Sequence, residues 1–363
     1  MSDKEKKTVL LLSAPVGAGH VLAAEALREY LEKKENIRVV HGNIFNFFPA
    51  FLGQAFLSCY LGVLEYAPWL YESAYKWGNQ DNGSLWFRGM LNHLLAFLGK
   101  RYLDEVNPDA VIATHATPAG IVSIYKKSHP QLWLGAVITD YTIHRWWLCD
   151  GVDTYFLADE SLRDKVNTSA EIFCSGIPVR ADFKFCERSA VREKYGWRED
   201  EKVCLIMGGG EGLLPMQEIL RELEAHYIEG LRLIAVTGRN EKMKRSLLKY
   251  DHVAEIYGYR DDVPQMMCGA DIMITKAGGL TCSEALLAGV QLLIYKPLPG
   301  QEAGNAEFFE RHCGVKIVKS IDELGKTVEV ACAVAKRNGE PSSCGHPFAT
   351  EDICAYVVRK LPI

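Results

Sequence analysis

Short apolar runs alternate with helix-like patterns along most of the chain. In the helix-like stretches apolar residues return every three or four positions, as Ala23, Leu27 and Leu31 do, whereas the strand-like runs are continuous. Continuous apolar runs are typical of parallel strands that are buried on both faces. The runs lie at residues 9–12, 37–40, 110–114, 135–139 and 154–158 in the first half and at 203–207, 231–236, 271–275 and 290–295 in the second. We therefore predict an α/β fold of β-α-β units, with helices on both faces of parallel sheets.

The length of 363 residues suggests about two domains. The strand pattern of the first half ends at residues 176–180, and a charged stretch at 186–202 leads into the next strand. We therefore predict an N-terminal domain over residues 1–180 and a C-terminal domain over 181–363, with the last helix a candidate to pack back on the N-terminal domain. Two doubly wound domains that face each other hold a ligand in the cleft at the carboxyl ends of their strands.

Residues 44–98 interrupt the alternation with a helical, aromatic-rich insert in the N-terminal domain. The insert holds 14 of the chain's 37 aromatic residues. An uncharged run at 47–64 approaches the length of a membrane span, but its proline, glycines and polar residues lower its hydrophobicity. We therefore expect a helix lying in a membrane interface, with Trp69, Trp77 and Trp86 near the lipid headgroups. The alternative is a helical subdomain packed wholly against the sheet, which the lack of a Lys/Arg-rich polar face favours.

Composition restricts the class of protein. A net charge of −5 argues against a nucleic-acid binder that works by bulk charge. The eleven cysteines include no C-x-x-C pair, which predicts neither a zinc site nor a disulfide framework and suits a reducing cytoplasm. The first apolar run is too short for the core of a signal peptide. We expect a cytoplasmic protein, or one attached to a membrane from its cytosolic side.

The loop between the first strand and the first helix is the most informative segment. Two glycines, Gly17 and Gly19, leave backbone N–H groups bare, and His20 adds an imidazole at the start of the helix. Helix N-termini attract anions because their first N–H groups are unpaired. The loop therefore fits either an anion site or a proton-transfer group at the edge of the sheet. The alternative is a tight turn with an incidental histidine.

Further polar residues follow other predicted strands of the first half. Asp140 and His144 come after the strand at 135–139, and His115 comes after the strand at 110–114. A single histidine is more often structural than catalytic. Because the carboxyl ends of parallel strands meet at one edge of a sheet, we nevertheless expect these clusters to lie together.

Glycine-rich turns follow two predicted strands of the second half. Gly208 and Gly209 lie in one turn, and Gly278 and Gly279 lie in the other. Glycine lets backbone N–H groups approach phosphate oxygens closely. We expect Glu284 in the first turn of the following helix, where a carboxylate can accept hydrogen bonds from two ribose hydroxyls. The alternative for this residue is a surface acid that the helix dipole favours.

Neighbouring residues complete this second candidate site. Thr281 or Ser283 can cap the helix, and Tyr259, after Gly258, can pack on a planar base. The chain has no Walker sequence and no D-x-D pair for a divalent cation. A bound diphosphate would therefore be neutralised by helix ends and loop amides, with Lys276, and we predict no metal site.

These motifs together resemble a known family. Ser13-Ala14-x-x-Gly17-x-Gly19-His20 is similar to the N-terminal signature of the monogalactosyldiacylglycerol synthases and the bacterial processive diacylglycerol glucosyltransferases. Further matching segments lie at residues 139–147, 151–156, 176–179, 258–261, 275–285 and 299–306. The resemblance runs from about residue 8 to 320 in order. One departure is Ala277, where many relatives have proline.

The resemblance implies two Rossmann-like domains that face a cleft, the GT-B fold, and an inverting transfer of a hexose from a UDP-sugar to a membrane lipid such as 1,2-diacylglycerol. UDP-sugar would be the donor substrate, with no other cofactor, and the protein would work on the cytosolic face of a membrane. By the same resemblance His20 would lie at the reacting centre, with Asp140 and His144 close by. The opening loop with Gly17 and Gly19, and His115, would lie on the acceptor side.

The resemblance also assigns the donor site. Glu284 would bind the ribose, and Gly258 and Tyr259 would lie near the uracil. The diphosphate would be bound by Gly278, Gly279 and Thr281. The sugar would be faced by Gln301, Glu302 and Asn305. His20 suits the base that takes the acceptor proton, because its ordinary pKa lies near neutrality, and Asp140 is the other candidate. Two other functions stay open: an isomerase of the UDP-N-acetylglucosamine 2-epimerase type, and a non-enzymatic nucleotide-sugar sensor.

Overall fold

Two six-stranded parallel sheets organise the chain, one in each of two compact units. The computed structural model describes residues 6–14, 17–48, 50–80, 82–183, 187–335, 342 and 344–361. The first unit comprises Met1–Arg180, Pro299–Gln301 and Phe348–Ile363, and the second comprises Ala181–Leu298 and Glu302–Pro347. Each unit is described by itself below.

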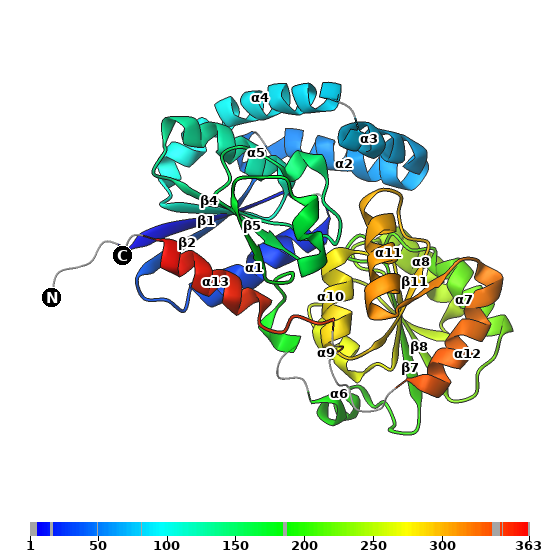
Figure 1. The fold of residues 1–363 in the computed structure, drawn as a ribbon. Coiled ribbons are helices and arrows are strands. Elements are labelled where there is room, and N and C mark those ends of the chain that lie inside the picture. Colours follow the sequence, from blue (N-terminus) through cyan, green and yellow to red (C-terminus); the bar gives the residue numbers. More distant parts are fainter. Residues whose placement is uncertain are drawn as a thin grey trace. The chain divides into compact units, whose positions relative to one another are not determined.

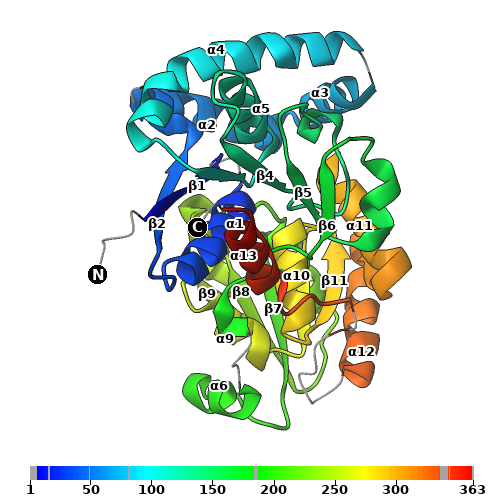
Figure 2. The same ribbon diagram turned by 60° about the vertical axis from the view of Figure 1, so that its left-hand side comes forward.

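The sheet of the first unit has the strand order β2-β1-β3-β4-β5-β6, with all neighbours parallel. Helices α1 and α13 cover one face, and α5 covers the other (Figures 1 and 2). The core under α1 and α13 includes Leu11, Leu27 and Val357, none of which is exposed. The elements are β1 (Lys7–Ser13), α1 (Ala18–Leu31), β2 (Ile37–Asn43), β3 (Ala110–Ala113), α5 (Ala116–Tyr125), β4 (Trp133–Val137), β5 (Thr154–Leu157), β6 (Glu171–Cys174) and α13 (Ala349–Lys360).

The insert consists of a short 3-10 helix, η1 (Ile44–Phe47), and three helices, α2 (Ala50–Tyr66), α3 (Pro68–Gln80) and α4 (Asn82–Val106). It therefore extends past the predicted end at residue 98, because α4 continues almost to β3. Helix α4 lies over α5 (Figure 2). A Cβ at Gly120 of α5 would lie 2.1 Å from Asn92 Nδ2, so the glycine permits this close packing. One face of α4 is thus firmly attached to the unit.

The opposite faces of α3 and α4 are exposed and apolar. With Tyr66 at the end of α2 included, the exposed large apolar side chains of this α3–α4 surface are Tyr66, Trp69, Leu70, Trp77, Trp86, Phe87, Met90, Leu94, Phe97 and Leu98. They are ten of the sixteen such side chains among the residues that the structure describes. The insert is therefore not packed wholly against the sheet, which removes that alternative. In the described part of the chain, no helix is long and apolar enough to cross a membrane.

The sheet of the second unit has the order β12-β11-β10-β7-β8-β9, again with all neighbours parallel. Helices α7, α8 and α12 pack on one face around a core that includes Ile219, Leu247 and Val328. Helices α9 and α10 lie on the other face (Figure 1). The elements are α6 (Arg188–Tyr195), β7 (Lys202–Met207), α7 (Met216–Ala225), β8 (Leu231–Val236), α8 (Glu241–Leu247), β9 (Ala254–Tyr257), α9 (Val263–Gly269), β10 (Ile272–Thr275), α10 (Gly279–Leu287), β11 (Gln291–Tyr295), α11 (Gln301–Cys313), β12 (Lys316–Val318) and α12 (Leu324–Val334).

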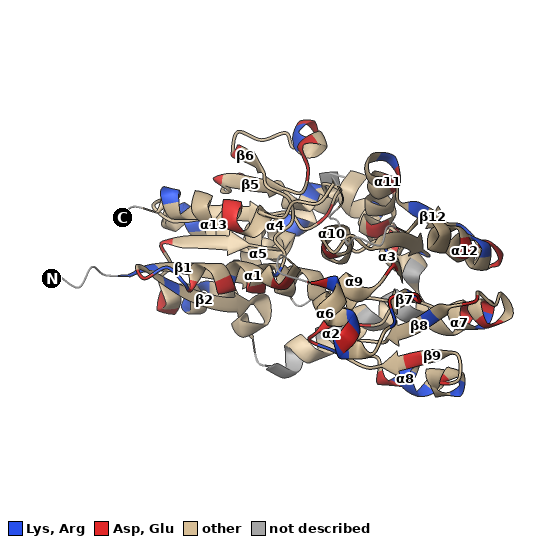
Figure 3. Cartoon of the chain, turned by 90° about the horizontal axis from the view of Figure 1, so that it is seen from below, with Lys and Arg blue, Asp and Glu red and all other residues tan. Residues whose placement is uncertain are grey.

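Acidic and basic residues are interspersed along the elements of both units (Figure 3), and one group of them is buried. Asp271 bonds to Arg188 at 2.7 Å and to Arg192 at 2.6 Å, and the side chains of Asp271 and Arg192 are each 1% exposed. Arg192 also donates to the carbonyl of Gly269. Part of the charged stretch that the sequence marked as a boundary is thus helix α6, held to the sheet through a buried ion pair.

The cysteines are dispersed through both units. Of the cysteines that the structure describes, nine are free thiols and Cys268 takes part in a disulfide bond, which the sequence did not predict. Within the described ranges no group of three or more His, Cys, Asp or Glu side chains is placed to hold a metal ion.

Candidate active site

His20 lies in the first turn of helix α1, which begins at Ala18. The sequence placed Gly19 and His20 at the end of the preceding loop, so the helix starts earlier than predicted. Gly17 precedes it with φ +90°, a conformation that glycine adopts readily and other residues rarely do. This turn at the end of β1 brings the imidazole to the carboxyl edge of the sheet.

Two oxygens hold the Nδ1 atom of His20. The carbonyl of Thr114, directly after β3, lies 2.9 Å away, and Thr139 Oγ1, after β4, lies 2.7 Å away. Because a carbonyl oxygen can only accept, Nδ1 carries the hydrogen and Nε2 carries the lone pair. Thr114 Oγ1 also donates to the main-chain carbonyl of His20 at 2.9 Å. The sheet order β1-β3-β4 is what makes these three residues neighbours.

Two further predicted residues surround His20. The ring of His115 meets the His20 ring edge to face, with 4.7 Å between centroids. His115 is the N-cap of α5, since its Nδ1 accepts from the backbone N–H of Thr117 at 3.1 Å. Asp140 follows Thr139 directly, is buried, and interacts electrostatically with His20. The structure therefore brings His20, His115 and Asp140 together, as the topology of parallel strands predicted.

The electrostatics keep both imidazoles neutral near pH 7. Burial lowers the pKa of His20 below its ordinary value of 6.5, against the opposing effects of the Asp140 charge and the Thr114 carbonyl. Burial, followed by the proximity of His20 and His144, holds the pKa of His115 well below 6.5. His20 thus has a free Nε2 that is ready to accept a proton, which is what a general base requires.

His144 lies nearby but has both ring nitrogens engaged. Its Nδ1 accepts from the backbone N–H of Trp146 at 3.2 Å, which caps the 3-10 helix η3 (Arg145–Trp147), and its Nε2 donates to the carbonyl of Tyr75 at 3.3 Å. Neither nitrogen is left for a proton transfer in this arrangement. The contacts of His144 therefore join the loop after β4 to helix α3 of the insert.

Gln301 groups with the first unit and contacts Asp140. Its Nε2 donates to Asp140 Oδ2 at 3.1 Å, and its Oε1 accepts from the hydroxyl of Tyr71 at 3.3 Å. The amide thereby links an insert residue to the carboxylate beside His20.

The second unit holds the two glycine-rich turns. A Cβ at Gly208 would lie 2.7 Å from the backbone nitrogen of Leu214, and Gly209 has φ +74°, so neither position readily takes a side chain. Gly278 is the N-cap of α10 and has no side-chain cap, so the expected capping by Thr281 or Ser283 is wrong. The hydroxyl of Ser283 instead donates to the carbonyl of Gly279 at 2.9 Å.

Glu284 lies in the second turn of α10, not in the first as predicted. The reason is that the helix begins at Gly279, before the residues expected to cap it. Glu284 is also 3% exposed, so it is not the surface acid of the alternative interpretation.

Lys276 lies beside both glycine-rich turns. Its side chain is 3.4 Å from the position of a Cβ at Gly209 and 4.0 Å from that of a Cβ at Gly278. It forms an ion pair with Glu302, whose other oxygen accepts from the backbone N–H of Leu298 at 2.9 Å. The turns and the start of α10 therefore surround one partly buried cation.

Asn305 and Tyr259 have different surroundings. Asn305 is fully buried and donates to the carbonyl of Ala277 at 3.0 Å, which supports the turn before α10. Tyr259 follows Gly258 after β9, is 49% exposed, and has the Arg239 guanidinium 4.8 Å from its ring centroid. Arg239, which closely follows the predicted strand at 231–236, and Thr114, the last residue of the predicted strand at 110–114, were not among the predicted site residues.

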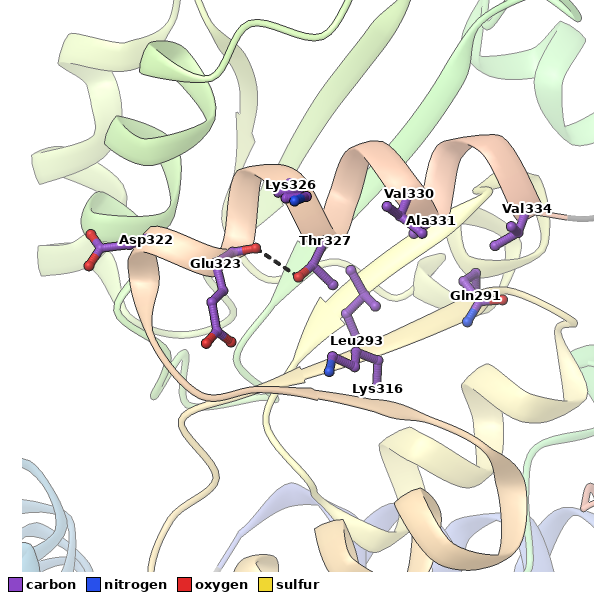
Figure 4. A pocket seen from close by; sticks show the side chains of 10 residues that line it. All are labelled: Gln291, Leu293, Lys316, Asp322, Glu323, Lys326, Thr327, Val330, Ala331 and Val334. Atoms are coloured by element: carbon purple, nitrogen blue, oxygen red, sulfur yellow. Dashed lines mark hydrogen bonds between the residues drawn. The ribbon is translucent and has the colours of Figure 1, made fainter.

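A surface hollow of about 570 Å³ lies elsewhere on the second unit, between α12 and the strands β11 and β12 (Figure 4). Its lining includes Leu293, Val330 and Val334, with Lys316 and Asp322 among the charged residues. None of the predicted site residues lines it.

Known proteins share sequence with both halves of the chain. The model for monogalactosyldiacylglycerol (MGDG) synthase matches residues 20–179, and that for the glycosyltransferase family 28 C-terminal domain matches residues 203–341. A processive diacylglycerol beta-glucosyltransferase from Bacillus pumilus is 28% identical over 337 residues, 89% of this chain and 86% of that protein. Its counterpart from Bacillus licheniformis is 29% identical over 353 residues, 92% of this chain and 89% of that protein. The chain is therefore similar to this glycosyltransferase family over most of its length. The resemblance drawn from the motifs is thereby confirmed.

Solved structures share the fold of this chain at low sequence identity. MurG of Acinetobacter baumannii has a TM-score of 0.64 at 16% identity, covering 97% of this chain and 99% of that chain. MnaA of S. aureus, solved with UDP, has a TM-score of 0.61 at 15% identity, covering 98% of this chain and 97% of that chain. A UDP-N-acetylglucosamine 2-epimerase has a TM-score of 0.59 at 14% identity, covering 98% of this chain and 96% of that chain. The predicted class of two Rossmann-like domains is confirmed, but the fold alone does not separate a transferase from an epimerase.

Proposed function

We propose that the protein transfers a hexose from a UDP-sugar to 1,2-diacylglycerol, with inversion at the anomeric carbon. The observation that carries the proposal is the free Nε2 of His20, held at a sheet edge in a chain whose curated relatives are processive diacylglycerol glucosyltransferases. UDP is present in a solved neighbour, which supports a uridine nucleotide donor.

In the proposed mechanism His20 acts as the general base. The acceptor hydroxyl gives its proton to Nε2, its oxygen forms a bond to the anomeric carbon, and the bond from that carbon to the diphosphate breaks as UDP leaves. The Thr114 carbonyl and the Asp140 charge both favour the imidazolium that results. Asp140 is the alternative base. Its contact with Gln301 instead fits a carboxylate that stabilises the cation.

The donor would be held by the second unit without a metal ion. Lys276, the glycine-rich turns with Gly208, Gly209, Gly278 and Gly279, and the start of α10 near Thr281 supply positive charge and N–H groups for a diphosphate. We assign Glu284 to the ribose and Gly258 with Tyr259 to the uracil. Glu302, oriented by Lys276, would face the hexose, and Asn305 supports the turn from behind.

We further propose that the exposed α3–α4 surface, formed by the ten apolar side chains described above, docks on the cytosolic face of a membrane. On α4 the residues Trp86, Met90, Leu94 and Phe97 lie on one side, opposite the face that packs on α5. Such a stripe suits a helix that lies in the membrane interface. The proposed acceptor gives a reason for such docking, because diacylglycerol resides in the lipid bilayer.

The charges of this surface favour apolar insertion over electrostatic binding. Among the described residues of 66–98, Lys76 is paired with Glu72 at 2.6 Å, and Arg88 donates to the main-chain carbonyls of the η3 segment. Binding should therefore need no anionic lipid and should depend little on salt.

One assay tests the function. The protein is incubated with UDP-glucose, UDP-galactose or UDP-N-acetylglucosamine, with and without diacylglycerol vesicles, and the products are identified by mass spectrometry and by the anomeric configuration. The proposal expects a β-linked glycolipid that forms only with lipid present. An epimerised sugar nucleotide in the absence of lipid would support the isomerase, and UDP-sugar binding with no product would support a sensor.

A further inference from the structure

The Nδ1 atom of His20 is shared between two oxygens from different strand ends. One is a main-chain carbonyl, Thr114 O at 2.9 Å, which no side-chain substitution removes. The other is a side-chain hydroxyl, Thr139 Oγ1 at 2.7 Å. Thr139 is 3% exposed, and it lies between β4 and Asp140. The hydroxyl is therefore a buried group that is aimed at the nitrogen opposite the free Nε2.

An imidazole that accepts a proton at Nε2 becomes a cation with a hydrogen on each nitrogen. Hydrogen bonds to a charged donor are stronger than those to a neutral one. An oxygen fixed at Nδ1 therefore stabilises the cation more than the neutral ring, and it prevents the ring from exchanging its tautomer or turning over.

We infer that Thr139 is a positioning residue that, together with the Thr114 carbonyl, fixes His20 in the Nδ1–H tautomer and supports the imidazolium formed during transfer. The inference rests on the proposed function, in which His20 is the base. Thr139 itself touches no substrate in this scheme.

The titratable groups that face His20 define the pH dependence to expect. They are His115 at the start of α5 and Asp140 after β4, with His144 acting through His115. None of them changes when the Thr139 hydroxyl is removed. Loss of that acceptor disfavours the cation, so the acid limb of the kcat/KM profile should move to lower pH.

The test compares Thr139→Val, which keeps the shape and loses the hydroxyl, with Thr139→Ser, which restores a hydroxyl. We expect Thr139→Val to lower kcat about tenfold to a hundredfold with little change in KM for the donor. Thr139→Ser should recover most of the activity. A matched control is Thr154→Val, since Thr154 is a buried threonine of the same sheet whose hydroxyl contacts Tyr356 instead.

A spectroscopic measurement adds a readout that loose packing alone would not move. In protein labelled with 15N-histidine, the His20 signals, assigned by their loss in His20→Gln, should show a protonated Nδ1 in the wild type, and in Thr139→Val the Nδ1–H signal should shift because one of its two acceptors is lost. Wild-type kcat, an unmoved acid limb and an unshifted Nδ1 signal in folded Thr139→Val would overturn the inference. If His20→Ala itself kept full activity, the proposed base would fail instead, so the two failures are distinguishable.

Discussion

Truncating the α3–α4 surface should release the protein from lipid while leaving its chemistry intact. The most informative change is the double variant Trp86→Ala/Phe97→Ala, because these side chains are 71% and 77% exposed. Both residues lie on the outer side of α4, so their removal leaves the packing on α5 unchanged.

The expected magnitude follows from the area that remains to be buried. Complete burial of a large apolar side chain is worth about 1.5–3 kcal/mol. With about three-quarters of each side chain still available, insertion contributes about 1–2 kcal/mol per residue and about 2–4 kcal/mol for the pair. The partition coefficient onto vesicles should therefore fall about thirtyfold to several hundredfold.

The assay is co-sedimentation with phosphatidylcholine vesicles that contain diacylglycerol, at low and at high salt. Tyr227→Ala is the matched control, because Tyr227 is 81% exposed but belongs to the second unit. Activity on a short-chain, water-soluble diacylglycerol should be the same in all variants. Unchanged partitioning of the double variant, or wild-type binding that high salt abolishes, would refute the reasoning.

Four further predictions concern the reaction and the fold. His20→Ala and Asp140→Asn should each lose most transfer activity and still bind UDP, and near wild-type turnover in both would remove them from the mechanism. Because burial lowers the His20 pKa and the neutral ring is the active form, wild-type kcat/KM should fall only below pH 6.5. Lys276→Ala should weaken UDP binding about tenfold to a hundredfold in calorimetry and leave uridine binding unchanged. An equal loss of affinity for UDP and for uridine would contradict a role of Lys276 in binding the diphosphate. Arg192→Ala should lower the free energy of unfolding, measured in urea, by about 3–5 kcal/mol, because Asp271 stays buried with one charge partner fewer. Arg198→Ala removes an exposed ion pair and should lower the free energy of unfolding much less.

The sequence predicted the central strands and the edge strand β2, but it missed the edge strands β6 and β12. Continuous apolar runs identified β1, β3, β4 and β5, because these strands are buried on both faces. The edge strands β6 and β12 were not among the predicted runs. They are short and begin with the exposed residues Glu171 and Lys316, so they lack the apolar pattern.

The site was predicted as a gathering of residues but not as a set of contacts. Parallel topology alone placed His20, His115 and Asp140 at one sheet edge. Thr114 and Thr139 both reach the Nδ1 of His20 because β3 lies beside β1 in the sheet and β4 lies beside β3. Sequence order does not give this adjacency. Similarly, Lys276 and Glu302 each seemed to be a ligand group, and the structure pairs them with each other.

The position of α13 has a consequence for how the chain is made. Ile353 and Val357 are fully buried in the same core as Leu27 of α1, and Thr350 bonds to the backbone of Val179. The first unit therefore stays incomplete during synthesis until α13 has left the ribosome, after the whole of the second unit has been made. Its apolar interior must remain protected for that interval, and a stop codon before residue 349 would damage a unit whose sheet is formed entirely by residues before 181.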